Sequence, residues 1–207
     1  MYQVSIFNNN VETVVHYPSA DQNDPHVNGL PLKEGLSMVD TLSFKLYTNS
    51  LGYDKLFELV TKVKVFDRRD NTIRFSGRVL NIDERMDNDG KIYKDVTCEG
   101  GLGYLNDTKQ RGSSFVANDV SGFLTQILSV HNSKVDHGKQ IHVGTVTVIS
   151  QVIHTCTYLT TLAEILAVRE SIGGDIRVRE VNGLLYLDWL QSFDDSIVEV
   201  SLGVNMK

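Results

Sequence analysis

Short segments in which apolar and polar residues alternate fill the first hundred residues of the chain. A two-residue period places every second side chain on the same face of a β-strand. The alternation is clear at residues 2–6, 41–47 and 72–80, and an Asp-Asn-Asp-Gly turn at residues 87–90 precedes a return segment at residues 91–99. Many short strands joined by turns predict an antiparallel barrel-like or sandwich domain.

The same alternation predicts where individual side chains of this half point. Within residues 72–80 the apolar residues share one face of a strand, and Arg78 lies on the other face. Gly77 occupies an inward position, where a strand often bends or bulges. Residues 53–60 are expected to form one short helix with Leu56 and Phe57 directed inward.

The pattern changes near residue 100, and two helices are predicted in the second half. Apolar residues recur at helical spacing over residues 120–128, with Asn118 as a candidate N-cap. A second helix begins at Thr161, and Glu164 stands three residues further on, as in a capping box. Two glycines at residues 173–174 are expected to end this helix with a left-handed C-terminal cap.

An Asn-Gly turn at residues 182–183, between two alternating segments, predicts a β-hairpin after the second helix. A polar, glycine-containing stretch at residues 105–115 is the expected domain boundary. The chain is therefore expected to be β-rich and of the α+β class. An antiparallel β-barrel-like domain is predicted over residues 1–109, and an α+β domain with two helices and a β-hairpin over residues 110–207.

Composition argues against several classes of protein. The 207 residues carry a net charge of −6, whereas proteins that bind nucleic acid usually present a basic face, so no specific nucleic-acid binding is expected. Neither a signal peptide nor a membrane-spanning segment is recognisable. Cys98 and Cys156 lie between apolar neighbours. They are expected to be buried free thiols in a protein made in a reducing cytoplasm, with a single disulfide as the alternative.

Histidines clustered in the second half raise the question of a metal site. His131, His137, His142 and His154 occur within 24 residues, and Cys156 follows closely. A zinc site needs ligands that converge tetrahedrally, which short regular spacings usually supply. The spacing here is irregular, and the first three histidines stand in polar, loop-like sequence. Solvated histidines are the preferred interpretation, and no metal site is predicted.

Other patterns that carry chemistry are incomplete. The glycines of residues 100–103 follow a strand, but Asn106 breaks the dinucleotide-binding fingerprint, so a structural turn is favoured. A Gly-x-Ser-x-Gly nucleophile turn is absent from the sequence. Acidic pairs such as Asp194 with Asp195, and Glu84 with Asp87, are expected to be solvated. No catalytic or cofactor-binding residue is therefore predicted, and the chain is not expected to be an enzyme.

Two sets of side chains leave alternatives open. Arg169 and two strand arginines, Arg177 and Arg179, are expected on exposed faces, with a contact to another subunit as the sharper alternative. The aromatic residues that could stack on a sugar are Tyr104, Tyr186 and Trp189, but a tryptophan on an alternating strand is more often part of a core.

Ten short stretches carry a resemblance to a known family: residues 2–8, 42–49, 52–53, 75–79, 96–100, 104–107, 161–162, 173–179, 182–183 and 186–189. They resemble the N-terminal region of phage and prophage tail proteins of the prophage endopeptidase-tail and tail-associated lysin family. That family is itself similar to the hub of the phage T4 baseplate. The stretches are spread over essentially the whole chain, and they are structural rather than catalytic.

The resemblance implies a role in architecture. It implies a virion structural protein, made in the bacterial host cytoplasm and placed at the tail tip. Three copies would form a ring that caps the tail tube, meets the distal tail protein and holds the tape-measure protein. Residues 201–207 resemble the start of a further hub domain, so that domain and the C-terminal peptidase or glycosidase of longer relatives are expected to be absent. The alternatives are a cell-wall hydrolase, or tail lysin, and a module that binds glycans or receptors.

Overall fold

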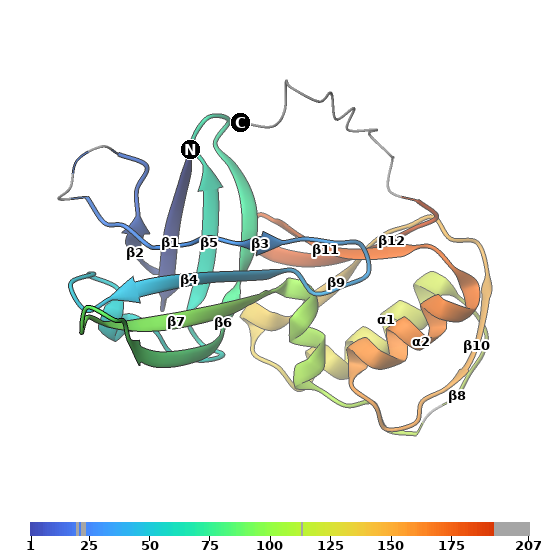
Figure 1. Cartoon of the computed structure of the whole chain (residues 1–207). Coiled ribbons are helices and arrows are strands. Elements are labelled where there is room, and N and C mark those ends of the chain that lie inside the picture. Colours follow the sequence, from blue (N-terminus) through green and yellow to red (C-terminus); the bar gives the residue numbers. More distant parts are fainter. Residues whose placement is uncertain (20, 22–23, 113, 193–207) are drawn as a thin grey trace.

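The computed structural model describes residues 1–19, 21, 24–112 and 114–192 (Figure 1). The elements of the first half are β1 (Tyr2–Asn8), β2 (Val11–His16), β3 (Leu32–Lys33), β4 (Thr41–Tyr47), the 3-10 helix η1 (Tyr53–Lys55), β5 (Lys62–Asp67), β6 (Thr72–Met86) and β7 (Ile92–Gly100). The elements of the second half are η2 (Gly101–Asp107), β8 (Ser114–Asp119), α1 (Val120–Asn132), η3 (His137–Lys139), β9 (Ile141–Val146), β10 (Gln151–Thr155), α2 (Thr161–Ile172), β11 (Asp175–Val181) and β12 (Leu184–Leu190).

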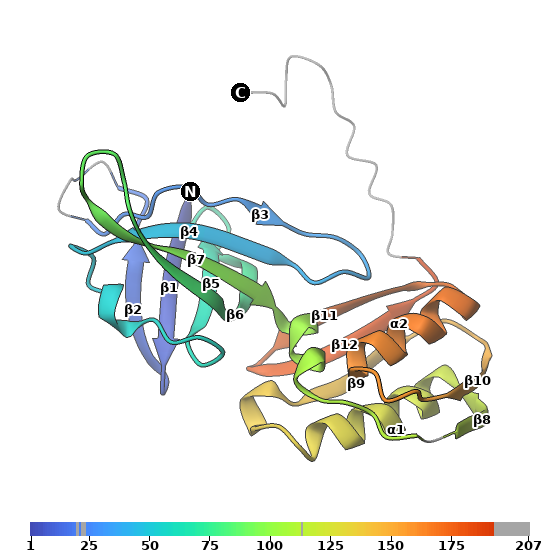
Figure 2. The same ribbon diagram turned by 60° about the horizontal axis from the view of Figure 1, so that its bottom comes forward.

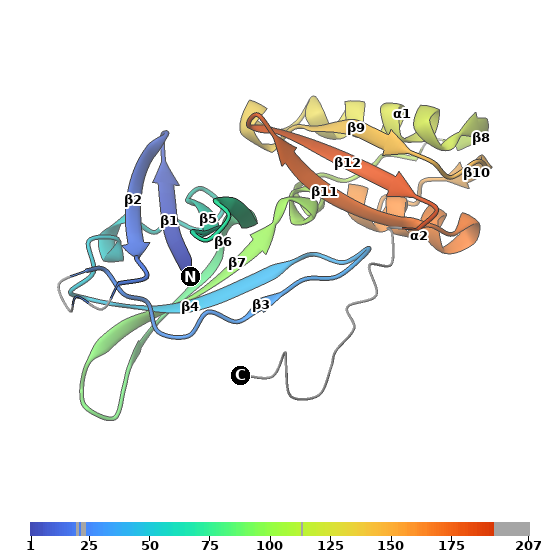
Figure 3. The same ribbon diagram turned by 90° about the horizontal axis from the view of Figure 1, so that it is seen from above.

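The first half forms one curved antiparallel sheet of seven strands in the order β2-β1-β5-β6-β7-β4-β3. Figure 3 shows β1 and β2 on one side of the fold and β3 and β4 on the other, so the sheet curls around its own core. Within the described residues the two end strands, β2 and β3, do not pair with each other, so the barrel-like sheet is open. The predicted β-rich α+β class is confirmed.

The alternation in the sequence becomes the inward face of this sheet. On β4, Leu42, Phe44 and Leu46 are fully or almost fully buried, as predicted. They pack with apolar residues of β1, β5, β6 and β7 in a core whose members range from Val4 to Cys98. A core of this kind stabilises a domain because apolar surface is removed from water.

Two predictions for the first half are wrong. The expected helix over residues 53–60 is a single 3-10 turn, Tyr53–Lys55, and Phe57 is exposed. Strand β6 contains no bulge at Gly77, since the register shifts instead at Arg74 and Leu80. The role of Gly77 is close approach, because a Cβ atom there would collide with the backbone carbonyl of Glu99 on β7.

The second half combines a three-stranded sheet, β11-β12-β9, with two helices on one face (Figures 1 and 2). Strands β11 and β12 form the predicted hairpin, and Asn182 and Gly183 both have positive φ, as a tight hairpin turn requires. Strand β9 pairs in parallel with β12, and β8 pairs with β10 in a separate ribbon. The second core includes Phe123 of α1, Ile165 of α2 and Trp189 of β12.

Helix α2 begins at Thr161, as predicted, but the N-cap of each helix differs by one position from the expected residue. The N-cap of α1 is Asp119, one position after Asn118, and its carboxylate accepts the backbone N–H of Gly122 at 2.6 Å. The N-cap of α2 is Thr160. Helix α2 ends at the two glycines, as predicted, and both have a φ of +82°. The ψ of −167° at Gly173 lies outside the left-handed helical region, so the cap is an extended positive-φ turn and not the expected left-handed cap. Among the described residues, no helix has the length and apolar character needed to cross a membrane.

Candidate functional site

A buried ion cluster joins the two halves of the chain. Arg78 of β6 is 2% exposed, and its guanidinium donates to Glu99 Oε1 at 2.6 and 2.8 Å and to both carboxylate oxygens of Asp107 at 2.6 Å. The same guanidinium lies 4.7 Å from the ring centre of Tyr104, within the range of a cation–π contact. Helix η2 supplies both Tyr104 and Asp107. The polar face of β6 is therefore covered by η2 at Arg78, whereas Arg74 on the same face is exposed.

The cluster favours the charged forms of Asp107 and Arg78. Burial raises the pKa of Asp107, but the hydrogen bonds and charge of Arg78 outweigh burial and lower that pKa below its usual value. Burial also lowers the pKa of Arg78, and the two carboxylates more than compensate. A buried ion pair of this kind depends on all of its partners, since removal of one leaves an uncompensated charge.

Two further contacts connect the halves at the outer edge of β11. Ser37, in the β3–β4 loop, donates its backbone N–H to the carbonyl of Ile176 at 2.9 Å, and its hydroxyl accepts the N–H of Ile176 at 3.1 Å. At the other end of β11, Glu180 pairs with Lys64 of β5 at 2.7 Å and accepts the Ser76 hydroxyl at 2.5 Å. An open groove lies between these contacts, lined by residues of the β3–β4 loop, β6, η2 and β11.

The structure separates the four histidines that the sequence groups together. His137 and His142 are exposed. His131 is fully buried, so its interpretation as a solvated side chain is wrong. Its Nδ1 lies 2.8 Å from the Thr108 hydroxyl and its Nε2 lies 3.2 Å from the Lys139 carbonyl, and burial lowers its pKa. These contacts fix the start of the second half on α1 and give His131 a structural role.

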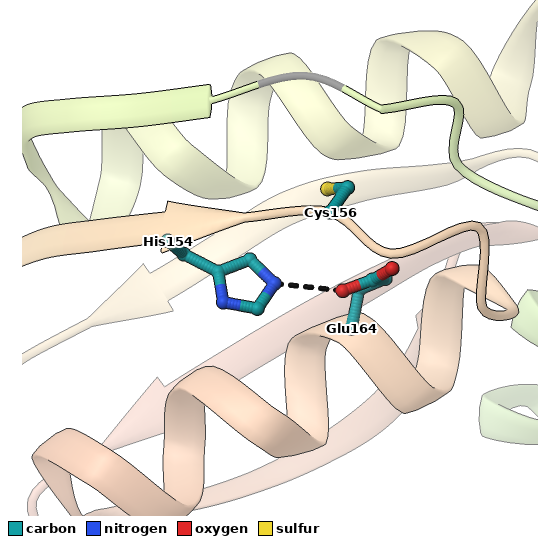
Figure 4. A group of neighbouring side chains, drawn as sticks. All are labelled: His154, Cys156 and Glu164. Carbon is teal, nitrogen blue, oxygen red and sulfur yellow. Dashed lines mark hydrogen bonds and ion pairs between the residues drawn. The ribbon is translucent and has the colours of Figure 1, made fainter.

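His154, Cys156 and Glu164 form a compact group of potential ligands (Figure 4). His154 and Cys156 are two positions apart at the end of β10, and Glu164 lies in the first turns of α2. His154 Nε2 is 2.7 Å from Glu164 Oε2, and one ligand atom from each of the three residues lies within 4.8 Å of the others. Cys156 and Glu164 are buried.

Glu164 does not close the predicted capping box. Its Oε1 accepts the backbone N–H groups of Thr157 at 2.7 Å and Leu159 at 3.2 Å, which belong to the loop before the helix. The sequence contains this group as His-x-Cys followed by Glu eight residues later. The stretch between Cys156 and Glu164 includes a loop and the start of a helix. The sequence therefore places His154 and Cys156 close together, but it does not predict that Glu164 joins them.

The other candidate residues have ordinary structural roles where the structure describes them. Trp189 and Tyr104 are buried, so a sugar cannot stack on them. Arg179 pairs with Asp188 at 2.6 Å, and Arg169 pairs with Asp175 at 2.8 Å.

Five more candidate residues remain from the sequence. Arg177 is exposed, with its Nε 4.0 Å from the Asp188 carboxylate. Glu84 is exposed, and Asp87 caps the β6–β7 turn through the N–H groups of Asp89 and Lys91. Asp194 and Asp195 lie outside the described residues.

Comparison with known proteins gives no match by sequence and clear matches by structure. No family model matches the chain, and no curated protein matches it. A 43 kDa tail protein of prophage MuSo2 from Shewanella oneidensis superposes with a TM-score of 0.59 at 11% identity, over 91% of this chain and 54% of the other. A tail protein from Neisseria meningitidis gives 0.56 at 13% identity, over 90% and 50%.

A component of the type VI secretion system of E. coli, described as structurally similar to T4 bacteriophage tail proteins, gives a TM-score of 0.53 at 10% identity, over 83% of this chain and 49% of the other. The chain thus spans about half the length of these proteins. Its fold is that of phage and prophage tail proteins and their secretion-system counterparts. The resemblance drawn from the residues alone is confirmed at the level of the fold.

Proposed function

We propose that the chain is a structural component of a phage or prophage tail tip, within a baseplate hub. The observation that carries the proposal is the match of nearly the whole two-part fold, β-sheet domain and α+β domain together, to tail proteins. The finer proposal is a trimeric ring that caps the tail tube and joins the distal tail protein to the cell-facing tip, with the tape-measure protein held above it.

The open sheet of the first half suits such an assembly. Strands β2 and β3 stand at the two ends of the seven-stranded order, and edge strands offer unpaired backbone groups to a neighbouring chain. A closed ring of identical subunits needs two different surfaces on each subunit that fit each other. We propose that the two sides of this sheet supply those surfaces, with residues 1–109 as the ring domain and residues 110–207 as the domain beneath it. Helix η2, at the end of the first domain, is the segment that packs into the second core and joins the two.

The rigid junction supports a role that works through shape. Ring subunits must keep a fixed angle between their domains, and the junction is held by the buried Arg78 cluster, the Ser37 contact and the Glu180 pair. Relative motion between domains is the default unless their interface is large and hydrophobic. Here η2 adds an apolar contact, because its Leu102, Tyr104 and Leu105 belong to the second core. We therefore propose that the chain acts as one rigid block and has no enzymatic activity of its own.

The test is a mass measurement in solution, on the chain alone and mixed with the distal tail protein. A trimer of the 23.2 kDa chain, or a stoichiometric complex with the distal tail protein, is expected. A monomer that ignores this partner at high concentration would contradict the proposal. A lysine in place of Val11, exposed on edge strand β2, should weaken assembly, whereas Leu51→Lys in the turn after β4 is the matched control.

The non-enzymatic part has its own test. Zymography of the purified chain on bacterial cell walls is expected to show no clearing beside a lysozyme control. A clear zone would overturn the structural assignment in favour of the hydrolase alternative.

A further inference from the structure

We propose that His154, Cys156 and Glu164 bind one zinc ion. This site is separate from the assembly role proposed above, because it lies in the second core, between β10 and α2. Thiolate, imidazole and carboxylate are the three protein ligand types that zinc takes, and the combination of sulfur with nitrogen disfavours magnesium and calcium.

The three side chains already converge. Zinc bonds of roughly 2.0–2.3 Å in a tetrahedral arrangement place the ligand atoms about 3.3–3.6 Å apart. The candidate ligand atoms all lie within 4.8 Å of one another, and the His154–Glu164 contact is 2.7 Å. Side-chain shifts of about an ångström, without backbone movement, would therefore place all three around one ion.

The carboxylate is held by its surroundings in a way that suits a ligand. The backbone N–H groups of Thr157 and Leu159 both bind Oε1 of Glu164, so its Oε2 is the oxygen directed at His154. Hydrogen bonds from outside the ligand set commonly orient metal-binding carboxylates and are part of the site. The ring of His154 is also fixed, since it meets Phe123 edge to face with the centroids 6.2 Å apart.

Charge balance favours the ion further. Glu164 is fully buried, and its ion-pair partner among the described residues is His154, which is charged only when protonated. A buried charge without compensation is costly. A site made of Zn²⁺, one carboxylate, one thiolate and one neutral imidazole would carry no net charge. Binding releases the Cys156 thiol proton and any proton shared by His154 and Glu164, and no group is oxidised or reduced.

The site has a route to solvent. The His154 side chain is 17% exposed, whereas Glu164 is fully buried. Zinc sites with three protein ligands complete their coordination with water. We therefore expect a water molecule as the fourth ligand, on the side of His154.

The experiment uses cobalt as a spectroscopic substitute for zinc. The full chain is stripped with a chelator, loaded with Co²⁺ and then titrated with Zn²⁺. A thiolate-to-cobalt charge-transfer band in the near ultraviolet is expected, with one ion per chain by elemental analysis and displacement by zinc. Cys156→Ser should abolish the band. Cys98→Ser should retain it, because Cys98, the other cysteine of the chain, is buried in the first core.

A second variant protects the test against misfolding of Cys156→Ser. His154→Asn keeps the cysteine and removes the partly exposed ligand, so metal affinity should fall at least about 10-fold while the fold, followed by Trp189 fluorescence, is kept. Wild-type protein with no charge-transfer band and substoichiometric zinc would overturn the proposal and leave a hydrogen-bonded His–Glu pair. A band that survives Cys156→Ser would overturn it as well.

Discussion

Replacing Arg78 with alanine tests whether the two halves of the chain are held together by buried charge. The guanidinium makes four hydrogen bonds, to Glu99 and Asp107, and is 2% exposed. Within the part of the chain that the structure describes, alanine would leave Glu99, itself 6% exposed, without its ion-pair partner. Removing one partner of a buried ion pair costs about 3–5 kcal/mol.

A loss of this size is large beside the total stability of a domain. For a chain of about 200 residues, each kcal/mol lowers the melting temperature by roughly 2–4 °C, so Arg78→Ala should melt about 6–20 °C lower. Calorimetry gives this shift directly. The fluorescence of Trp189, the single tryptophan of the chain, reports whether the second core unfolds in the same transition.

The matched control is Arg85→Ala. Arg85 also pairs with a carboxylate, that of Asp83 at 3.3 Å, but both side chains are more than half exposed. An exposed pair contributes about 0–1 kcal/mol. If Arg78→Ala lost no more stability than Arg85→Ala, the argument from buried charge would be wrong. The double variant Arg78→Ala with Glu99→Ala should recover part of the loss, because it also removes the orphaned carboxylate.

Three further results are expected. Burial raises the pKa of Glu180, but hydrogen bonds from Lys64 and Ser76 outweigh burial and lower that pKa. The stabilisation that Glu180 contributes is therefore complete above about pH 4.5 and is lost as the pH falls below that value. In Glu180→Gln the melting temperature should fall less steeply with decreasing pH than in the wild type. Burial lowers the pKa of His131, so the unfolded chain takes up this proton at a higher pH than the folded chain does. The free energy of unfolding should therefore fall as the pH drops below 6.5, and His131→Asn should remove this part of the pH dependence. A pH dependence that is the same in His131→Asn as in the wild type would contradict the argument. Gly77→Ala should lower the free energy of unfolding, measured with denaturant, by about 1–3 kcal/mol, because the new Cβ atom collides with the Glu99 carbonyl. Gly112→Ala should lower it less, because the nearest atoms to its new Cβ belong to the side chain of Tyr158.

Much of the fold could be predicted from the sequence because local periodicity records which face of an element is apolar. Strand β4, the β11–β12 hairpin and the end of α2 follow from alternation, an Asn-Gly turn and two glycines. Periodicity does not record what covers the opposite face. Arg78 lies on the polar side of β6, as predicted, yet it is buried because η2 packs over that side.

The candidate metal group shows the same limit. His154 lies on β10 and Cys156 follows its last residue, and a two-residue spacing in extended chain favours the same face. Glu164 resembles a capping residue because it stands three positions after Thr161, and local pattern alone favours that interpretation. Only the packing of α2 beside β10 turns its carboxylate toward His154. The third ligand therefore depends on tertiary structure that spacing does not contain.

The contact of Ser37 with β11 has a consequence for biosynthesis. Its partners, Asp175 and Ile176, are separated from it by 138 and 139 positions. A ribosome has therefore released all seven strands of the first sheet long before it makes the residues that the β3–β4 loop binds. The first core can form during translation, as domains commonly do in N-terminal order. The β3–β4 loop can therefore bind β11 only after these later residues have left the ribosome, so this contact forms after the first core.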